Sequence, residues 1–151
     1  MHVTAQKSDE FFSIKIVEVI APPTENDLEW LVCEVEWRRL DQEFKAVSEC
    51  LTSSEWQEFL SWIKSLETDP RDSVLSFCEP SLHCVYLAAS DVVVFVCWLE
   101  LTPGGQDRQS VALSFRRTSI KMQKSINPRF RGLRILEAWM AGPSSAMTPA
   151  G

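Results

Sequence analysis

Between residues 50 and 66, apolar side chains recur at the three- and four-residue spacing of one helix face. These positions are Trp56, Phe59, Leu60, Ile63 and Leu66, with Trp62 widening the same stripe. Thr52, followed three residues later by Glu55, is the sequence signature of a capping box, in which each side chain satisfies the other's backbone N–H. The pattern predicts an amphipathic helix of about residues 53–67 that packs against a sheet.

Upstream of this helix the spacing changes to the two-residue alternation of β-strands. Three such segments are present, at residues 11–20, 28–38 and 43–50. The second segment carries on one face Leu31, Cys33, Val35 and Trp37, and on the other Glu34, Glu36 and Arg38. In the first segment the alternation slips near Val17, which predicts a β-bulge. Because the connections are short, we expect an antiparallel meander.

Downstream of the helix, four more strands are predicted, at residues 73–79, 82–88, 91–101 and 109–117. The third contains VVVFVCWL, which is apolar at every position and favours a central strand buried on both faces. Thr118 is expected to cap a short helix through residue 126. Near-helical spacing then predicts a terminal helix over residues 131–141, whose stripe comprises Phe130, Leu133, Leu136, Trp139 and Met140.

Together these segments indicate an α+β fold: a mostly antiparallel sheet of about six to seven strands, with one main amphipathic helix packed on it and short C-terminal helices. The chain has 151 residues, 45% of them hydrophobic, which suffices for one core. We expect a single α+β domain over residues 1–141. Residues 142–151 are small, polar and proline-containing, which predicts a disordered tail.

Charge is unevenly distributed along the chain. The net charge is −6, with 16 acidic and 7 basic residues in positions 1–75 against 5 and 8 in positions 76–151. An acidic balance argues against a nucleic-acid-binding domain and is compatible with a basic protein partner. The basic segment 108–134 lacks the glycine and aromatic pattern of an RNA-recognition strand, so we interpret it as a solvated or intramolecularly paired face.

Three features of the sequence favour a cytoplasmic location. No apolar run reaches the roughly 20 residues that a membrane-spanning helix needs, and the first residues lack an apolar stretch of signal-peptide type. Five cysteines, an odd number without a close CxxC spacing, give no disulfide framework. We therefore expect a cytoplasmic protein that does not bind a membrane.

Two pairs of residues have the side chains that catalytic sites use. Glu34 and Glu36 lie roughly 6 to 7 Å apart on one strand face, a spacing that acid–base carboxylates can have, but a solvated strand face is the favoured explanation because no adjacent pocket residue supports catalysis. Cys78 and His83 flank a predicted hairpin turn, but no third group that would orient such a pair is identifiable. With two histidines in all and no glycine-rich phosphate loop, we expect no metal, no cofactor and no enzymatic activity.

Five short motifs follow one another in a characteristic order. They are Glu29-Trp30-Leu31, Cys50-Leu51-Thr52 with Glu55 and Trp62, Phe77-Cys78-Glu79-Pro80 before Leu82, Glu100-Leu101-Thr102-Pro103, and Pro128-Arg129. Over about residues 11–131 this ordered set resembles the WapI-type family of small bacterial immunity proteins and their uncharacterised relatives. The chain departs from the family pattern after residue 117, where Arg-Thr-Ser-Ile replaces an Asp-Leu helix start.

The resemblance implies a cytoplasmic antitoxin-like protein that binds a polymorphic toxin, often a nuclease, and has no catalysis of its own. We hypothesise that the acidic residues Glu29, Glu34 and Glu36 dock against a basic cleft of that toxin. A second hypothesis is a structural or adaptor domain that assembles through Trp139 and the terminal helix. A third is a small enzyme that uses Cys78 with His83, or the two strand glutamates.

Overall fold

The structure is a computed structural model that describes residues 1–22, 24–25, 27–78, 82–100 and 108–123. Within these residues nine strands form two antiparallel sheets, with one long helix. The strands are β1 (His2–Gln6), β2 (Glu10–Ile20), β3 (Trp30–Arg39), β4 (Gln42–Thr52), β5 (Ser73–Ser76), β6 (Leu82–Leu87), β7 (Val92–Glu100), β8 (Arg108–Arg116) and β9 (Ile120–Gln123), and the helix is α1 (Ser53–Thr68). The α+β class is confirmed, but the single sheet of six to seven strands is corrected to two sheets.

The larger sheet has the strand order β4-β3-β2-β1-β9, and the smaller has the order β5-β6-β7-β8. The predicted meander β2-β3-β4 is confirmed, because each strand pairs antiparallel with the next. The predicted bulge is also confirmed, since the β2–β3 register shifts between Ile16 and Glu18. After β8 the chain passes through a 3-10 turn at Arg117–Ser119 and joins the edge of the larger sheet as β9.

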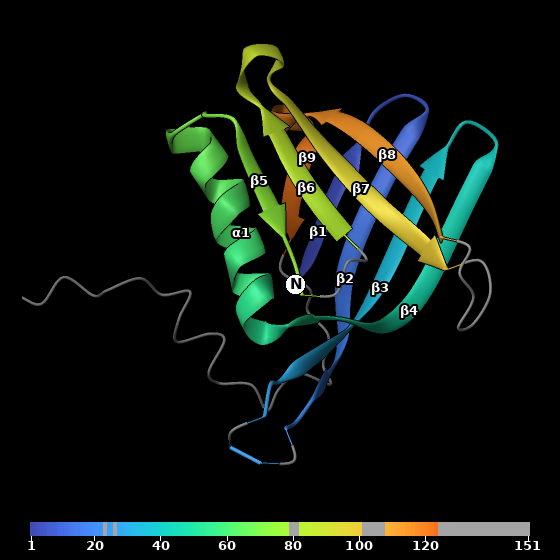
Figure 1. The fold of residues 1–151 in the computed structure, drawn as a ribbon. Helices are drawn as coiled ribbons and strands as arrows, with labels where there is room; N and C mark the ends of the chain where they lie inside the picture. The colour runs from blue at the N-terminus through green and yellow to red at the C-terminus, as the bar shows by residue number, and fades with distance from the viewer. Residues whose placement is uncertain (23, 26, 79–81, 101–107, 124–151) are drawn as a thin grey trace, which may run out of the picture.

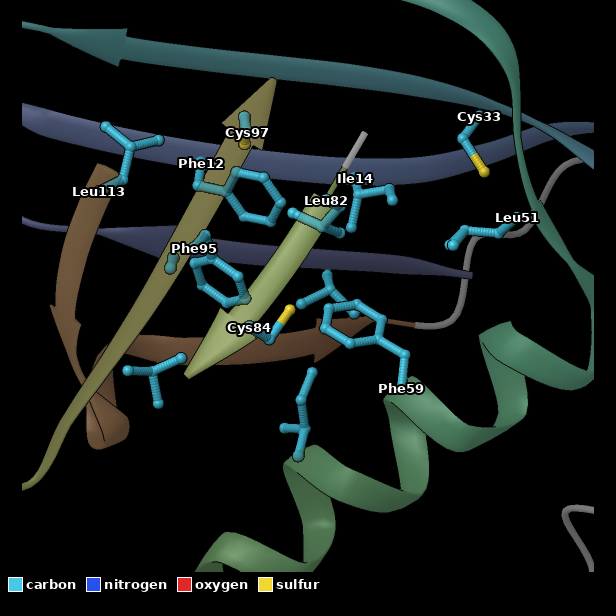
Figure 2. Packing of buried hydrophobic residues seen from close by; sticks show 14 of the residues in the cluster. Phe12, Ile14, Cys33, Leu51, Phe59, Leu82, Cys84, Phe95, Cys97 and Leu113 are labelled. Carbon is cyan, nitrogen blue, oxygen red and sulfur yellow. The ribbon is translucent and has the colours of Figure 1, made fainter. Parts of the chain in front are cut away.

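The core lies between the two sheets and is closed on one side by α1, which runs alongside β5 (Figure 1). Phe12 of β2 stacks on Phe95 of β7 with their ring centroids 4.3 Å apart. Phe59 of α1 points into the same cluster and meets Phe95 edge-on at 6.4 Å (Figure 2). Because one side chain from each layer meets at Phe95, the sheets and the helix share a single core.

The helix start is as predicted. The Glu55 backbone N–H donates to Thr52 Oγ1 at 3.3 Å, and the Thr52 N–H donates to the Glu55 carboxylate at 2.8 Å. These two bonds satisfy orphan N–H groups that every helix N-terminus presents. The buried side chains of α1 are Glu55, Trp56, Phe59, Ile63 and Leu66. The helix ends at Thr68, close to the predicted position.

Strand β7 lies between β6 and β8, so its interior place in a sheet is as predicted. Its predicted burial on both faces is wrong in part. Val93 and Phe95 are fully buried, whereas Val94 and Val96, which point the other way, are half-buried. The reason is that the core covers one face of the smaller sheet, while the other face packs against no further layer in the described part of the chain.

Two strands, β1 and β9, lie where no strand is predicted. The short helix expected from Thr118 is wrong over its described part, because Arg117–Ser119 is a 3-10 turn and Ile120–Gln123 is β9. Strand β9 pairs with β1, and these backbone partners outweigh the weak local helix signal. The predicted terminal helix 131–141, tail 142–151 and domain limit at 141 lie outside the described residues.

Candidate functional site

The face of the larger sheet that points away from the smaller sheet carries most of the polar positions of the meander, and we call it the outer face. Strand alternation and register place on it His2 and Thr4 of β1, Phe11, Ser13 and Lys15 of β2, Glu34, Glu36 and Arg38 of β3, and Lys45 and Val47 of β4. The residues between them, such as Ile14 and Cys33, are buried in the core. The alternation predicted for β3 is therefore confirmed.

Glu34 and Glu36 lie together on the outer face, and each carboxylate has a cation beside it. Lys45 Nζ is 3.2 Å from Glu34 Oε2, and Arg38 Nε is 3.8 Å from Glu36 Oε1. Lys15 lies directly opposite Glu34 in the β2–β3 register. The face is thus of mixed charge, and its carboxylate side chains keep 26% and 29% of their surface exposed.

An open depression of about 370 Å³ lies on the outer face, lined by His2, Phe11, Ser13, Lys15, Glu34, Glu36 and Gln123. His2 Nε2 lies 2.8 Å from Ser13 Oγ, a hydrogen bond whose direction depends on the histidine tautomer. Burial lowers the pKa of His2, with Lys15 and the N-terminal ammonium acting in the same direction against Glu34 and Glu36. His2 is therefore neutral at pH 7, which leaves one lysine and two carboxylates as the charged groups in the depression's lining.

An aromatic ring borders this depression. The Arg38 guanidinium carbon lies 4.7 Å from the centroid of the Phe11 ring, which is directly opposite in the register. Such a cation–π contact holds a long side chain in place at a cost in its rotamer freedom. Arg38 is consequently shared between the aromatic ring and the Glu36 carboxylate.

Glu29 occupies a different place. It precedes β3, its carboxylate accepts a hydrogen bond from the Ser53 hydroxyl, and its backbone carbonyl accepts from the Ser53 N–H at 3.0 Å. Ser53 is the first residue of α1. Of the three residues predicted to bind a partner, the structure therefore brings Glu34 and Glu36 together and places Glu29 at the helix start.

Cys78 follows β5 and contacts the start of α1. Its backbone N–H donates to Glu55 Oε1 at 2.5 Å, and its side chain also hydrogen-bonds this carboxylate. Desolvation raises the pKa of Glu55, but the hydrogen bonds from Cys78 and Thr52 outweigh it and hold the pKa below its ordinary value. His83 lies on β6 opposite Ser76. The contacts shown for Cys78 connect two segments of the fold, which is a structural role.

Two arginines of the basic segment have partners within the molecule. Arg117 Nε lies 2.8 Å from Asp91 Oδ1, and the same oxygen accepts the Tyr86 hydroxyl at 2.9 Å. Arg116 donates to the Ser90 carbonyl at 3.3 Å. Intramolecular pairing is thus confirmed for these two arginines, and residues beyond 123 lie outside the described part.

Sequence reasoning found the glutamates of the outer face but not their neighbours. Lys15, Lys45 and Phe11 reach Glu34, Glu36 and Arg38 only through the pairing register of β2, β3 and β4. The signals that would find them are the lengths of the two connecting loops and the bulge near Val17, which together set this register. Among the described residues, no helix is both long and apolar enough to cross a membrane, and no three His, Cys, Asp or Glu side chains gather as metal ligands would.

Comparison with known proteins gave one match. A family model described as the immunity protein WapI-like family matches residues 4–127. This range includes β2, β3 and β4, part of β1, the helix α1 and the whole of the smaller sheet. No curated protein and no solved structure matched the chain.

Proposed function

The chain belongs to the WapI-like immunity protein family, and we propose that it neutralises a bacterial toxin by binding it directly. Family membership over residues 4–127 is the observation that carries this proposal, since it indicates an immunity function. Inactivation of a toxin by a tight complex needs complementary surfaces and no chemical reaction. We therefore propose a protein without enzymatic activity whose partner is a toxin domain.

We propose that the toxin binds at the outer face, with Glu34 and Glu36 contacting basic side chains of a nuclease-like cleft. Each carboxylate is now paired with a half-exposed cation, Lys45 at 53% or Arg38 at 51% side-chain exposure. Exposed ion pairs of this kind contribute only about 0.2–1 kcal/mol, so a cation of the partner can replace them at little cost. A close, well-aligned charge pair across an interface can contribute about 1.5 kcal/mol or more, which exceeds the exposed pair that it replaces.

Glu29 belongs to the same proposal as a contact outside the outer face, near the start of α1. Its carboxylate already accepts a hydrogen bond from the Ser53 hydroxyl, but a carboxylate has further lone pairs for a partner cation.

We also propose that the protein acts in the cytoplasm. The support is chemical: the cysteines at positions 33, 50, 84 and 97 are buried thiols without a disulfide, as is usual where thiols stay reduced.

The proposal is tested with the product of the gene immediately upstream as the candidate toxin. Co-expression with the wild-type protein is expected to keep the host alive, and the two chains are expected to co-elute in size-exclusion chromatography. Host death together with the absence of a complex would remove the basis for an immunity function.

The surface is tested with charge-reversal variants in the same assay. We expect Glu34→Lys and Glu36→Lys each to weaken toxin binding about tenfold or more, because a close interface charge pair contributes about 1.5 kcal/mol or more. Glu58→Lys on the exposed side of α1 is the matched control and is expected to bind like the wild type. Binding should also weaken as salt is raised, because charge steering is screened. If all three variants bind equally, the toxin uses another face.

A further inference from the structure

A groove of about 280 Å³ runs between the C-terminal half of α1 and the last strand of the larger sheet. Its lining includes Ile63, Leu66 and Glu67 of α1, Arg117 of the 3-10 turn, and Ile120 and Met122 of β9. Four of its seven lining residues are apolar, and the other three are Glu67, Arg117 and Thr118. It lies on a different side of the molecule from the outer face.

The groove is an uncovered part of the core rather than an ordinary surface feature. Met122 lies opposite Val3 and Ile120 lies opposite Ala5 in the β1–β9 register, so the four side chains share the core-facing side of the sheet. Val3 and Ala5 are 0% exposed, whereas Met122 keeps 38% of its surface exposed. Apolar positions that continue a buried face without a cover are expected to pack against a further element.

The chain itself supplies an element of the right chemistry at the right place. Residues 124–151 follow directly from β9, and their apolar stripe of Phe130, Leu133, Leu136, Trp139 and Met140 has near-helical spacing. The seven residues from Gln123 to Phe130 reach at most about 23 Å, which is enough to turn back over the neighbouring groove. The family match ends at residue 127, so the whole of this stripe lies outside the matched range.

Charge points to the same occupant. The last turn of α1 has no basic residue, although the carbonyl end of a helix favours cations. Glu67 and Arg117 both line the groove, and Arg117 is already paired with Asp91. The segment after β9 carries Arg129, Arg131 and Arg134 before its first acidic residue, Glu137. Placing these arginines beside α1 would neutralise an acidic helix end while the apolar stripe fills the groove.

We propose that residues 130–140 fold back as an amphipathic helix and cover this groove, with Leu133, Leu136 and Met140 against Met122 and Ile120. The α+β domain then extends to the end of this helix. The proposal is independent of toxin binding, because it concerns the packing of the chain on itself and uses none of the outer-face residues.

Trypsin cleavage of the full-length protein tests the proposal at two sites inside the segment. Cleavage after Arg131 and Arg134 is expected to be slow in the wild type and about tenfold faster in Met122→Thr, because loss of the apolar contact raises the undocked population. Leu87→Thr is the matched control, since Leu87 is 44% exposed at the end of β6, and it should leave both rates unchanged. Equal rates in all three proteins, as fast as in an isolated peptide of residues 124–141, would overturn the proposal.

A double-mutant cycle in urea distinguishes docking from an indirect effect. Met122→Thr and Leu136→Ser are each expected to lower the folding equilibrium constant, and the double variant should lose much less than the product of the two single losses. Independent losses would overturn direct contact. The coupling should also be unchanged on dilution, because protection that disappears at low protein concentration would mean that a second copy of the chain occupies the groove.

Discussion

Replacing Glu55 removes a buried carboxylate that joins the start of α1 to the segment after β5. Glu55 is 7% exposed and accepts hydrogen bonds from the backbone N–H groups of Thr52 and Cys78, at 2.8 Å and 2.5 Å, and from the Thr52 hydroxyl at 3.0 Å. In Glu55→Ala both backbone donors lose their acceptor. Each unsatisfied buried donor costs about 1–3 kcal/mol.

Because the hydrogen bond from the Cys78 N–H is only partly buried, the lower part of that range applies there. We expect Glu55→Ala to lower the free energy of unfolding by about 3 kcal/mol, a large share of the total for a domain of this size. Urea denaturation followed by tryptophan fluorescence measures the loss. Glu58→Ala, an exposed carboxylate on the same helix, is the control and should change stability by less than about 0.5 kcal/mol.

The pH dependence provides a separate check on the cause. The folded-state pKa of Glu55 lies below its ordinary value of 4.5, so ionisation stabilises the fold above that value. This contribution is lost as pH falls from about 4.5 through the folded-state pKa. The stability difference between wild type and Glu55→Gln should therefore shrink as the solution is acidified below that pH. A difference that is independent of pH, or equal losses in Glu55→Ala and Glu58→Ala, would refute the reasoning.

Three further perturbations probe other parts of the molecule. Phe95→Ala should lower the free energy of unfolding by about 3–5 kcal/mol in urea denaturation, because it leaves a cavity where Phe12 and Phe59 meet; a loss below about 1 kcal/mol would contradict a shared core. Asp91→Ala should lower the urea midpoint more than Asp91→Asn, since Asp91 has φ 53°, which Asn tolerates better than Ala; the opposite order would contradict this. His2→Gln should flatten the loss of stability between pH 7 and pH 5, because a lowered folded-state pKa means that stability falls as pH drops below about 6.5; an unchanged slope would show that His2 does not cause it.

The best-predicted parts of the fold are those whose signals are local. The capping box of Thr52 and Glu55 needs only two side chains three residues apart, and the helical stripe needs only spacing, so both are readable from the chain. The bulge near Val17 is also local, because one extra residue shifts the alternation within a single strand.

The parts that were missed depend on partners far away in the chain. Strand β9 is four residues long and lies at the sheet edge, where it pairs with β1, about 120 residues away in the chain, while the five-residue β1 pairs with both β2 and β9. Through this pairing β9 brings the chain from the smaller sheet, where it leaves as β8, back to the edge of the larger one. No window of the sequence contains both strands, so local patterns cannot show that they meet.

The same distinction applies to the candidate site. Alternation alone places Glu34 and Glu36 on one face of a strand, and the structure confirms this placement. That Lys45 bonds Glu34 depends on the β3–β4 register, which runs without a shift from the hairpin turn at Arg39 and Gln42 as far as Val32 and Glu49. A slip of one residue would direct Lys45 to the core side, so its role follows from the hairpin rather than from its own neighbours.

The mixed charge of the outer face changes what the acidic composition implies for binding. A uniformly acidic face would attract basic proteins of many kinds, whereas Lys45 and Lys15 beside the glutamates repel a partner whose cations are not in register with Glu34 and Glu36. These lysines would then make the outer face selective for the toxin over other basic proteins.

Lys45→Glu tests this view. The variant should associate faster at low salt with an unrelated basic protein, because steering follows the net charge of the face, while its affinity for the toxin should not increase in proportion. Glu58→Lys, which lies away from the outer face, serves as the control. Surface plasmon resonance measures the association rates with the unrelated protein and with the toxin. If Lys45→Glu strengthens binding to the toxin and to the unrelated protein by the same factor, the lysine contributes to charge alone and selectivity resides elsewhere on the molecule.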